Sequence, residues 1–246
     1  MEHGLIDIHQ HLVYQMDDGP KTWEETEAML RAAEEQGIQR IIATSHAFPG
    51  RVHFEYDGYL DKVNAINRFA KQKGWTIRLF PGAEIFYSSH ALHKLDVDDI
   101  PTLAMSQYVL VEFYPEVKAD ELLHAMRELA NGGYKPILAH VERYSCLQDK
   151  PEMLRELHYL GVMIQMNART VLESNGIFGG KRYIRKLLKE GVVDFVATDA
   201  HNTSSRPVCL RNAYEFLEKH YGREMADRLT WKNQLDILPE LDADVE

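Results

Sequence analysis

Short β-branched runs alternate with amphipathic helical patterns along this chain, and no other feature limits its possible folds as much. Most neighbouring runs are separated by a segment with helical periodicity. Parallel strands need such crossover connections, whereas antiparallel strands can be joined by a tight turn. The alternation therefore predicts an α/β fold with parallel strands at residues 5–8, 39–44, 76–80, 108–113, 136–139, 162–166 and 193–198.

The clearest helix signal runs from Thr22 to Gln36. Thr22 and Glu25 have the spacing of a capping box, and Gly37 stands where a C-terminal cap belongs. Residues 86–106 are less regular and indicate a helical excursion, and the acidic tail from Leu238 is expected to fray. Further helices are predicted at 59–70, 119–131, 151–160, 180–190 and 207–221.

Residue types that bind metal ions recur at or just beyond the ends of the predicted strands. Taken singly, each has a simpler reading; Asp17 in "DDGP", for example, reads as a turn residue. Glu84 and Glu112, however, lie between apolar neighbours, where a charge is costly unless it is paired or coordinated. Because α/β barrels place catalytic groups at the C-terminal ends of their strands, the set predicts a metal cluster. Its candidate ligands are His9, His11, Asp17, His46, Glu84, Glu112, His140, Asp199 and His201.

This ligand set indicates hydrolysis of an anionic substrate. It contains imidazoles and carboxylates but no cysteine, which suits Mn²⁺, Fe²⁺ or Zn²⁺. Arg143 follows His140 by three residues and Arg206 follows His201 by five. Since guanidinium groups bind phosphate oxygens through paired donors, both arginines are candidates for an anion clamp. A pocket for an aromatic ring is a further hypothesis, with Phe48, Phe86, Tyr87 and Tyr114 as its lining.

Composition excludes several other functions. The formal net charge of −10, without any run of Lys or Arg, disfavours nucleic-acid binding. No apolar run approaches the ~20 residues of a membrane-spanning helix, and the first residues do not resemble a signal peptide. We therefore expect one cytoplasmic domain over residues 1–246, with no membrane insertion.

The two cysteines fit a reducing compartment but not a cysteine-nucleophile phosphatase. Such an enzyme needs an arginine six positions after its cysteine. Glu152 and Glu215 occupy those positions after Cys146 and Cys209.

With these motifs set out, the chain resembles the polymerase and histidinol phosphatase (PHP) superfamily. Within it, the chain is most similar to the CpsB/YwqE-type manganese-dependent protein tyrosine phosphatases of Gram-positive bacteria. Family members tend to carry other residues at Gln10, Ala47 and Val141, none of which is a candidate ligand. The shared stretches span residues 6–207 and are "IDIHQH", "DDGPKTWEE", "IIATSH", "PGAEI", "VEF", "AHVERY", "IFG" and "ATDAHN…RP".

The resemblance implies a distorted seven-stranded β/α barrel and three divalent ions, with Mn²⁺ preferred over Fe²⁺ or Zn²⁺. A hydroxide held by two ions would attack phosphorus, while Arg143 and Arg206 stabilise the transferring phosphoryl group. The implied substrate is phosphotyrosine on the tail of a bacterial tyrosine kinase that controls capsule or exopolysaccharide synthesis. The implied ligands are His9, His11, Glu84 and Asp199 for the first ion, Glu84, Glu112 and His140 for the second, and Asp17, His46 and His201 for the third.

Three alternatives remain open at this point. The same site would serve a phosphatase for histidinol phosphate or another small phosphomonoester. A nuclease is disfavoured by the acidic charge, and a metal-bound regulatory module without turnover is disfavoured by the complete ligand set. The oligomeric state and the general acid for the leaving group are not indicated by any motif.

Overall fold

The computed structural model describes residues 4–148, 150–174 and 181–239, and within them seven parallel strands follow one another in chain order. The last strand returns to the first through a parallel bridge between Gln10 and Ala200, where the His11 amide donates to the Ala200 carbonyl at 2.9 Å. The sheet thereby closes into a distorted barrel. The strands are β1 (Leu5–Gln10), β2 (Ile38–Ala47), β3 (Arg78–Phe86), β4 (Tyr108–Glu112), β5 (Lys135–Leu138), β6 (Met163–Asn167) and β7 (Phe195–Ala197).

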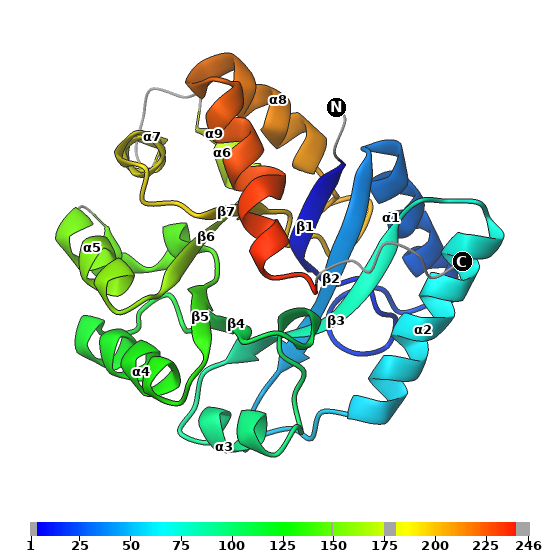
Figure 1. Ribbon diagram of the computed structural model, residues 1–246, viewed down its shortest axis with the longest axis horizontal. Coiled ribbons are helices and arrows are strands. Elements are labelled where there is room, and N and C mark those ends of the chain that lie inside the picture. Colours follow the sequence, from blue (N-terminus) through cyan, green and yellow to red (C-terminus); the bar gives the residue numbers. More distant parts are fainter. Residues whose placement is uncertain (1–3, 149, 175–180, 240–246) are drawn as a thin grey trace.

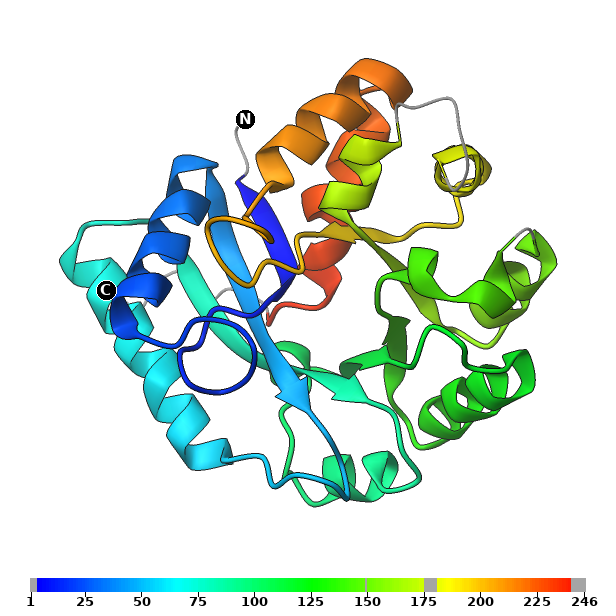
Figure 2. The same cartoon turned by 180° about the vertical axis from the view of Figure 1, so that it is seen from behind.

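Helices surround the strands in chain order, as the colours of Figures 1 and 2 show. All six predicted helices are present, and short helices also occur within 86–106. The predicted α/β fold and the implied seven-stranded barrel are therefore confirmed. No helix in the described ranges is both long and apolar enough to cross a membrane. The helices are α1 (Trp23–Glu35), α2 (Tyr56–Gln72), α3 (Ala91–Asp96), α4 (Ala119–Asn131), α5 (Pro151–Tyr159), α6 (Ala168–Glu173), α7 (Lys181–Glu190), α8 (Leu210–Tyr221) and α9 (Arg223–Asp227).

The ends of α1 form largely as the sequence predicts. The Thr22 hydroxyl accepts from the Glu25 amide at 3.3 Å, and Gly37 ends the helix at φ +71°, a conformation that favours glycine. The other half of the capping box differs, because the Glu25 carboxylate accepts from the Lys21 amide at 2.6 Å rather than from Thr22. Two further expectations, the frayed tail beyond residue 239 and the shared "IFG" stretch at 177–179, lie outside the described residues.

The barrel interior is apolar at one end and polar at the other. Residues near the strand starts, such as Phe80 and Phe195, form an inner core with Leu110 and Ile137. This core is separate from the larger one between strands and helices. Because alternate residues of a strand face the same side, the inward positions beyond these apolar layers belong to Glu84, Glu112 and Asp199. Apolar residues of the C-terminal segment and of the turn before β4 close the start of the barrel: Leu103, Ala104, Trp231, Ile237 and Leu238.

A register irregularity in β1 helps to place His9. Ile6 and Ile8 belong to the inner core, so strict alternation would turn His9 away from the barrel axis. The pairing of β1 with β2 shifts between Asp7 and Gln10, and His9 joins the polar group at the C-terminal end of the barrel. The irregularity thus lets apolar packing and a polar site share one short strand.

We expect Tyr59→Phe to destabilise the barrel. The buried Tyr59 hydroxyl donates to the Ala43 carbonyl at 2.6 Å and accepts from the Gly82 amide at 3.0 Å, which ties α2 to β2 and β3. Loss of the hydroxyl leaves buried backbone groups without a partner, which should lower the free energy of unfolding by about 1–3 kcal/mol in urea denaturation. Tyr56→Phe, at a partly exposed position of the same helix, is the matched control and should cost less. Equal effects would contradict the assigned role.

Candidate metal centre

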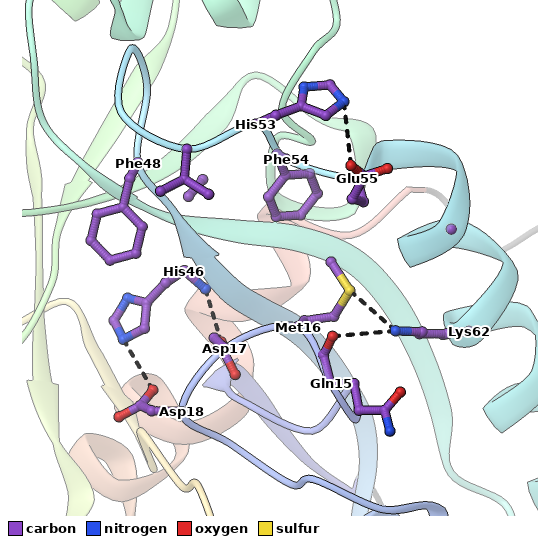
Figure 3. Close-up of a pocket in the computed structure, with 13 residues that line it drawn as sticks. Gln15, Met16, Asp17, Asp18, His46, Phe48, His53, Phe54, Glu55 and Lys62 are labelled. Atoms are coloured by element: carbon purple, nitrogen blue, oxygen red, sulfur yellow. Dashed lines mark hydrogen bonds and ion pairs between the residues drawn. The ribbon is translucent and has the colours of Figure 1, made fainter.

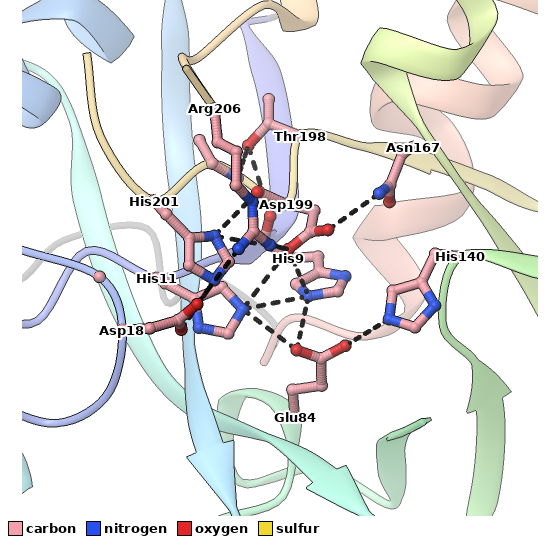
Figure 4. Close-up of polar contacts among 12 residues, drawn as sticks. His9, His11, Asp18, Glu84, His140, Asn167, Thr198, Asp199, His201 and Arg206 are labelled. Carbon is pink, nitrogen blue, oxygen red and sulfur yellow. Dashed lines mark hydrogen bonds and ion pairs between the residues drawn. The ribbon is translucent and has the colours of Figure 1, made fainter. Parts of the chain in front are cut away.

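Buried imidazoles and carboxylates converge at the C-terminal end of the barrel (Figure 4). In the first group, His9, His11, Glu84 and Asp199 each offer an atom within 4.8 Å of the others. The Nε2 atoms of His9 and His11 lie 3.2 and 3.1 Å from Glu84 Oε2 and 3.3 Å from each other. Two nitrogens bound to one ion at about 2.1 Å stand roughly 3 Å apart. The spacing therefore fits a shared cation.

A second group lies on the other side of Glu84. Its Oε1 atom lies 2.8 Å from His140 Nε2, and Glu112 Oε2 lies 3.5 Å from the same nitrogen. Glu112 Oε1 in turn lies 2.9 Å from His46 Nδ1. Since the two oxygens of Glu84 face different groups, this carboxylate would belong to the ligands of both.

The third group combines His11, Asp18, His46 and His201. Asp18 Oδ1 lies 3.1 Å from His201 Nε2 and 3.4 Å from His46 Nε2. His201 Nε2 is buried and has no partner in hydrogen-bond geometry, although it lies near Asp18 Oδ1. His46 Nδ1 is likewise buried without such a partner, but it faces Glu84 and Glu112 of the second group. An ion placed between such atoms would bind to all of them in place of the missing hydrogen bonds. The residues of this group therefore also fit a metal.

The structure places Asp17 differently from the sequence prediction. Asp17 Oδ2 accepts from His11 Nδ1 at 2.7 Å and from the His46 amide at 2.9 Å, and its Oδ1 accepts from the Gly19 amide. Asp17 therefore orients two candidate ligands, while the neighbouring Asp18 carboxylate faces the third group. The spacing of the "DDGP" turn does not distinguish the two aspartates, because only the turn geometry decides which one points inward.

Gln165 and Asn167 also belong to the site, although the sequence prediction does not include them. Gln165 Oε1 accepts from His9 Nδ1 at 3.2 Å and from the His140 amide at 2.7 Å. Asn167 joins this network by accepting from Gln165 Nε2 and donating to Asp199 Oδ2, both at 2.9 Å. Such outer partners fix the orientation and tautomer of ligand imidazoles. The signal was available, since "MIQMN" places polar residues at alternate positions of a buried strand.

The two predicted clamp arginines both lie at the site. Arg143 Nη2 donates to Asp199 Oδ2 at 2.6 Å, and Arg206 Nη2 donates to Asp199 Oδ1 at 2.9 Å. Arg206 Nη1 also lies 3.3 Å from Asp18 Oδ2. Both side chains are partly exposed, and each guanidinium carries more donors than these contacts use. They are therefore placed to bind an anion that enters from solvent.

Ion pairing changes the protonation of the cluster. Burial lowers the pKa of His11, but hydrogen bonds to Asp17 and Glu84 outweigh it and raise that pKa to about 9. Against the same burial penalty, Glu112 and Glu84 raise the pKa of His140 to about 9. Burial alone would raise the pKa of Glu84, yet contacts with its histidine neighbours hold it well below the usual range. In metal-free protein, protonated imidazoles therefore balance the carboxylates near neutral pH.

Metal-free protein should lose thermal stability as the pH rises from 7 to 9.5. A group whose folded pKa is raised stabilises the fold fully below its unfolded pKa, and that stability is lost as the pH passes the folded pKa. For His11 and His140 this interval runs from 6.5 to about 9. Differential scanning fluorimetry of chelator-treated protein measures Tm across it. Metal-loaded protein is the control and should change less, because ions replace the protons. A metal-free Tm that rises over this interval would contradict the pairing.

Asp18→Asn and Asp17→Asn should affect metal binding differently. Asp18→Asn removes a candidate ligand, and the variant is expected to lose about one ion per chain after gel filtration, as measured by mass spectrometry of metals. Asp17→Asn removes only an orienting contact, so it should keep the stoichiometry at saturating metal but bind roughly 10–100-fold more weakly. The reverse result would return Asp17 to the ligand set.

Polar ligand groups at the C-terminal end of a β/α barrel are typical of metal-dependent hydrolases. The family model for capsular polysaccharide synthesis proteins CpsB/CapC matches residues 5–239, and the chain belongs to this family. It is 34% identical over 240 residues to the tyrosine-protein phosphatase CpsB of Streptococcus pneumoniae, covering 95% of this chain and 98% of that protein. It is 31% identical over 236 residues to the tyrosine-protein phosphatase YwqE of Bacillus subtilis, covering 94% and 91%. The resemblance predicted from the motifs is confirmed.

Solved structures agree with this assignment. This chain aligns with a crystal structure from the pair YwqE of Bacillus subtilis and CpsB of Streptococcus pneumoniae, with TM-score 0.81 and 29% identity. Those two proteins are described as unique metal-dependent tyrosine phosphatases. The alignment covers 90% of this chain and 89% of that one. Histidinol phosphate phosphatase from Lactococcus lactis aligns with TM-score 0.58 at 16% identity, covering 91% and 94%. The second likeness is one of fold alone.

Proposed function

We propose that this protein is a metal-dependent protein tyrosine phosphatase, a phosphoric monoester hydrolase. The observation that carries the proposal is the set of converging ligand groups, found in a chain whose curated relatives are tyrosine-protein phosphatases. Cysteine chemistry does not compete with it. Burial raises the pKa of Cys209 to about 12 and also raises that of Cys146, so neither thiol is activated as a nucleophile.

The site holds three ions in this proposal, with Mn²⁺ preferred and Fe²⁺ or Zn²⁺ as alternatives. Three overlapping ligand groups support the number, and their imidazole and carboxylate donors support the choice of metals. When bound, such ions lower the pKa of water and polarise phosphoryl oxygens. The ligands are His9, His11, Glu84 and Asp199 for the first ion, Glu84, Glu112 and His140 for the second, and Asp18, His46 and His201 for the third, with His11 and His46 near two groups.

The protein's own side chains bind and orient the phosphoryl group. Arg143 and Arg206 approach from the solvent side and present guanidinium donors to its oxygens. Asp199 holds one nitrogen of each arginine on its two oxygens, so the two cations keep a fixed spacing. Asn167 fixes Asp199 in turn. Preorganised donors of this kind stabilise charge in phosphoryl transfer without reorganisation during the reaction.

The proposed substrate is phosphotyrosine on a protein, with the tail of a bacterial tyrosine kinase as the natural target. The family's role in capsular polysaccharide synthesis supports this choice, and the net charge of −10 disfavours a nucleic acid. We also propose a cytoplasmic location, which the free cysteines support.

Phosphate release tests the proposed function directly. Mn²⁺-loaded protein is incubated in parallel with a tyrosine-phosphorylated peptide, a serine-phosphorylated peptide of the same sequence and histidinol phosphate. We expect the highest kcat/KM for the phosphotyrosine peptide. A higher value for histidinol phosphate would keep the metal site but overturn the substrate assignment.

Substitutions of the proposed ligands should lower kcat, whereas substitution of a clamp arginine should mainly raise KM. His140→Ala and Asp199→Ala should abolish turnover, with at least about 10³-fold loss of kcat, because each removes a proposed ligand. Arg206→Ala should mainly raise KM, by roughly 10-fold or more, since it removes one charged contact to phosphate. Arg155→Ala, an exposed arginine on α5, is the matched control and should leave both parameters unchanged. Full activity of either ligand variant in metal-free form would contradict the proposed mechanism.

A further inference from the structure

A cavity of about 510 Å³ opens directly beside the third ligand group (Figure 3). Asp18 and His46 belong both to its wall and to that group. We call it the leaving-group cavity. The apolar part of its wall comes from the loop before α1 and from the end of β2 with the segment that follows it: Met16, Ala47, Phe48, Val52 and Phe54.

Phe48 connects the ligand group to this apolar wall. Its ring centroid lies 5.6 Å from that of the His46 imidazole, at an interplanar angle of 34°. The ring is partly exposed, and Figure 3 shows it beside the His46 imidazole. Phe48 is therefore an aromatic residue of the cavity wall that lies next to a candidate ligand.

The charged side chains of the wall are already engaged. Lys62 Nζ donates to the backbone carbonyls of Tyr14 at 3.1 Å and Gln15 at 3.4 Å. His53 and Glu55 lie 3.8 Å apart at exposed positions. The cavity thus offers apolar contact in its interior and little for a second anion, which favours an uncharged ring over a charged or strongly polar group.

A second, larger cavity of about 680 Å³ lies on the other side of Phe86. The Phe86 ring stacks on Phe48 at a centroid distance of 5.8 Å, and Tyr114 and Arg51 line that cavity with it. None of the residues that line it belongs to a ligand group. In an aryl phosphate a single ester oxygen joins the ring to phosphorus. A ring whose phosphoryl group lies at the metal site must therefore occupy a cavity that shares a wall with that site.

We propose that the leaving-group cavity receives the phenyl ring of phosphotyrosine and that Phe48 is a specificity-determining residue. The inference rests on the proposed function and adds to it the surface by which the protein would discriminate aryl phosphates from alkyl phosphates. The short side chain of phosphoserine leaves the cavity empty and gains no contact with Phe48. The preference for phosphotyrosine then comes from apolar burial of the leaving group rather than from the ligand groups, which both substrates share.

Kinetics of Phe48→Ala test the proposal, with Phe86→Ala as the matched control. We expect Phe48→Ala to lower kcat/KM for a phosphotyrosine peptide roughly 10- to 50-fold, because it removes one face of ring burial. The value for the phosphoserine peptide of the same sequence should stay within about threefold. Phe48→Leu keeps an apolar side chain and should recover part of the loss. Phe86→Ala removes a residue of the second cavity's wall that stacks on Phe48, and it should change the ratio of the two substrates much less than Phe48→Ala does.

Binding of phosphonates provides a second readout that needs no turnover. Calorimetry with metal-loaded protein should show that benzylphosphonate binds more tightly than methylphosphonate. Phe48→Ala should remove most of that difference without weakening methylphosphonate. Should Phe48→Ala fail to fold, Phe48→Leu and Val52→Asn test the same wall, the latter at a position that is 64% exposed.

Equal losses for both substrates, or equal binding of both phosphonates to the wild type, would overturn the cavity assignment. A Phe86→Ala variant that loses phosphotyrosine preference as strongly as Phe48→Ala would place the ring in the second cavity. These results differ from failure of the proposed function, in which the wild type releases phosphate from neither peptide. The phosphonate comparison remains decisive in that case as well.

Discussion

The fully buried carboxylate of Glu84 is the group on which the rest of the site depends. Its oxygens lie 3.2 Å from His9, 3.1 Å from His11, 3.3 Å from His46 and 2.8 Å from His140. A charge at this depth is costly unless opposite charges surround it. The four imidazoles come from β1, the residue after it, β2 and the turn after β5, so one side chain on β3 fixes much of the barrel's polar end. Protons or metal ions must supply the balancing charge.

The barrel separates this polar end from an apolar interior. Phe80, Leu110 and Ile137 fill the space below the ligand groups, and Ile237 from the C-terminal segment closes the start of the barrel. Two candidate ligands, His140 at φ +35° and Asp199 at φ +53°, leave their strands in the left-handed region. Such backbone conformations cost of order 1–3 kcal/mol and persist where the surroundings enforce them. The stability of the packed core thus offsets the cost of the strained backbone at the site.

Much of this arrangement could be predicted from the sequence, because periodicity is a local property. Runs such as "YVLVEF" indicate a buried strand and place Glu112 at its end without knowledge of the partners. Asp18 was missed because two adjacent aspartates share one turn. The alternation in "MIQMN" marks Gln165 as a polar residue in a buried strand, but its partners, His9 and His140, come from distant segments and are known only from the structure.

The lining of the leaving-group cavity could not be predicted from the sequence. Phe48, Phe86, Tyr87 and Tyr114 were hypothesised to line one pocket. In the structure Phe48 lines the cavity at the ligand groups, whereas the other three line the second cavity. Their positions after ligand residues are equivalent in sequence. Only the paths of the loops after β2, β3 and β4 separate them, and loop paths depend on contacts between distant segments.

The most direct test of the account measures metal content and phosphatase activity on the same samples. Protein stripped with a chelator is reloaded with increasing Mn²⁺, passed through gel filtration, and assayed for bound metal and for phosphate release from a phosphotyrosine peptide. We expect binding to saturate at three ions per chain and activity to appear only as the ligand groups fill. Full activity in protein that holds less than a tenth of an ion per chain would contradict this expectation.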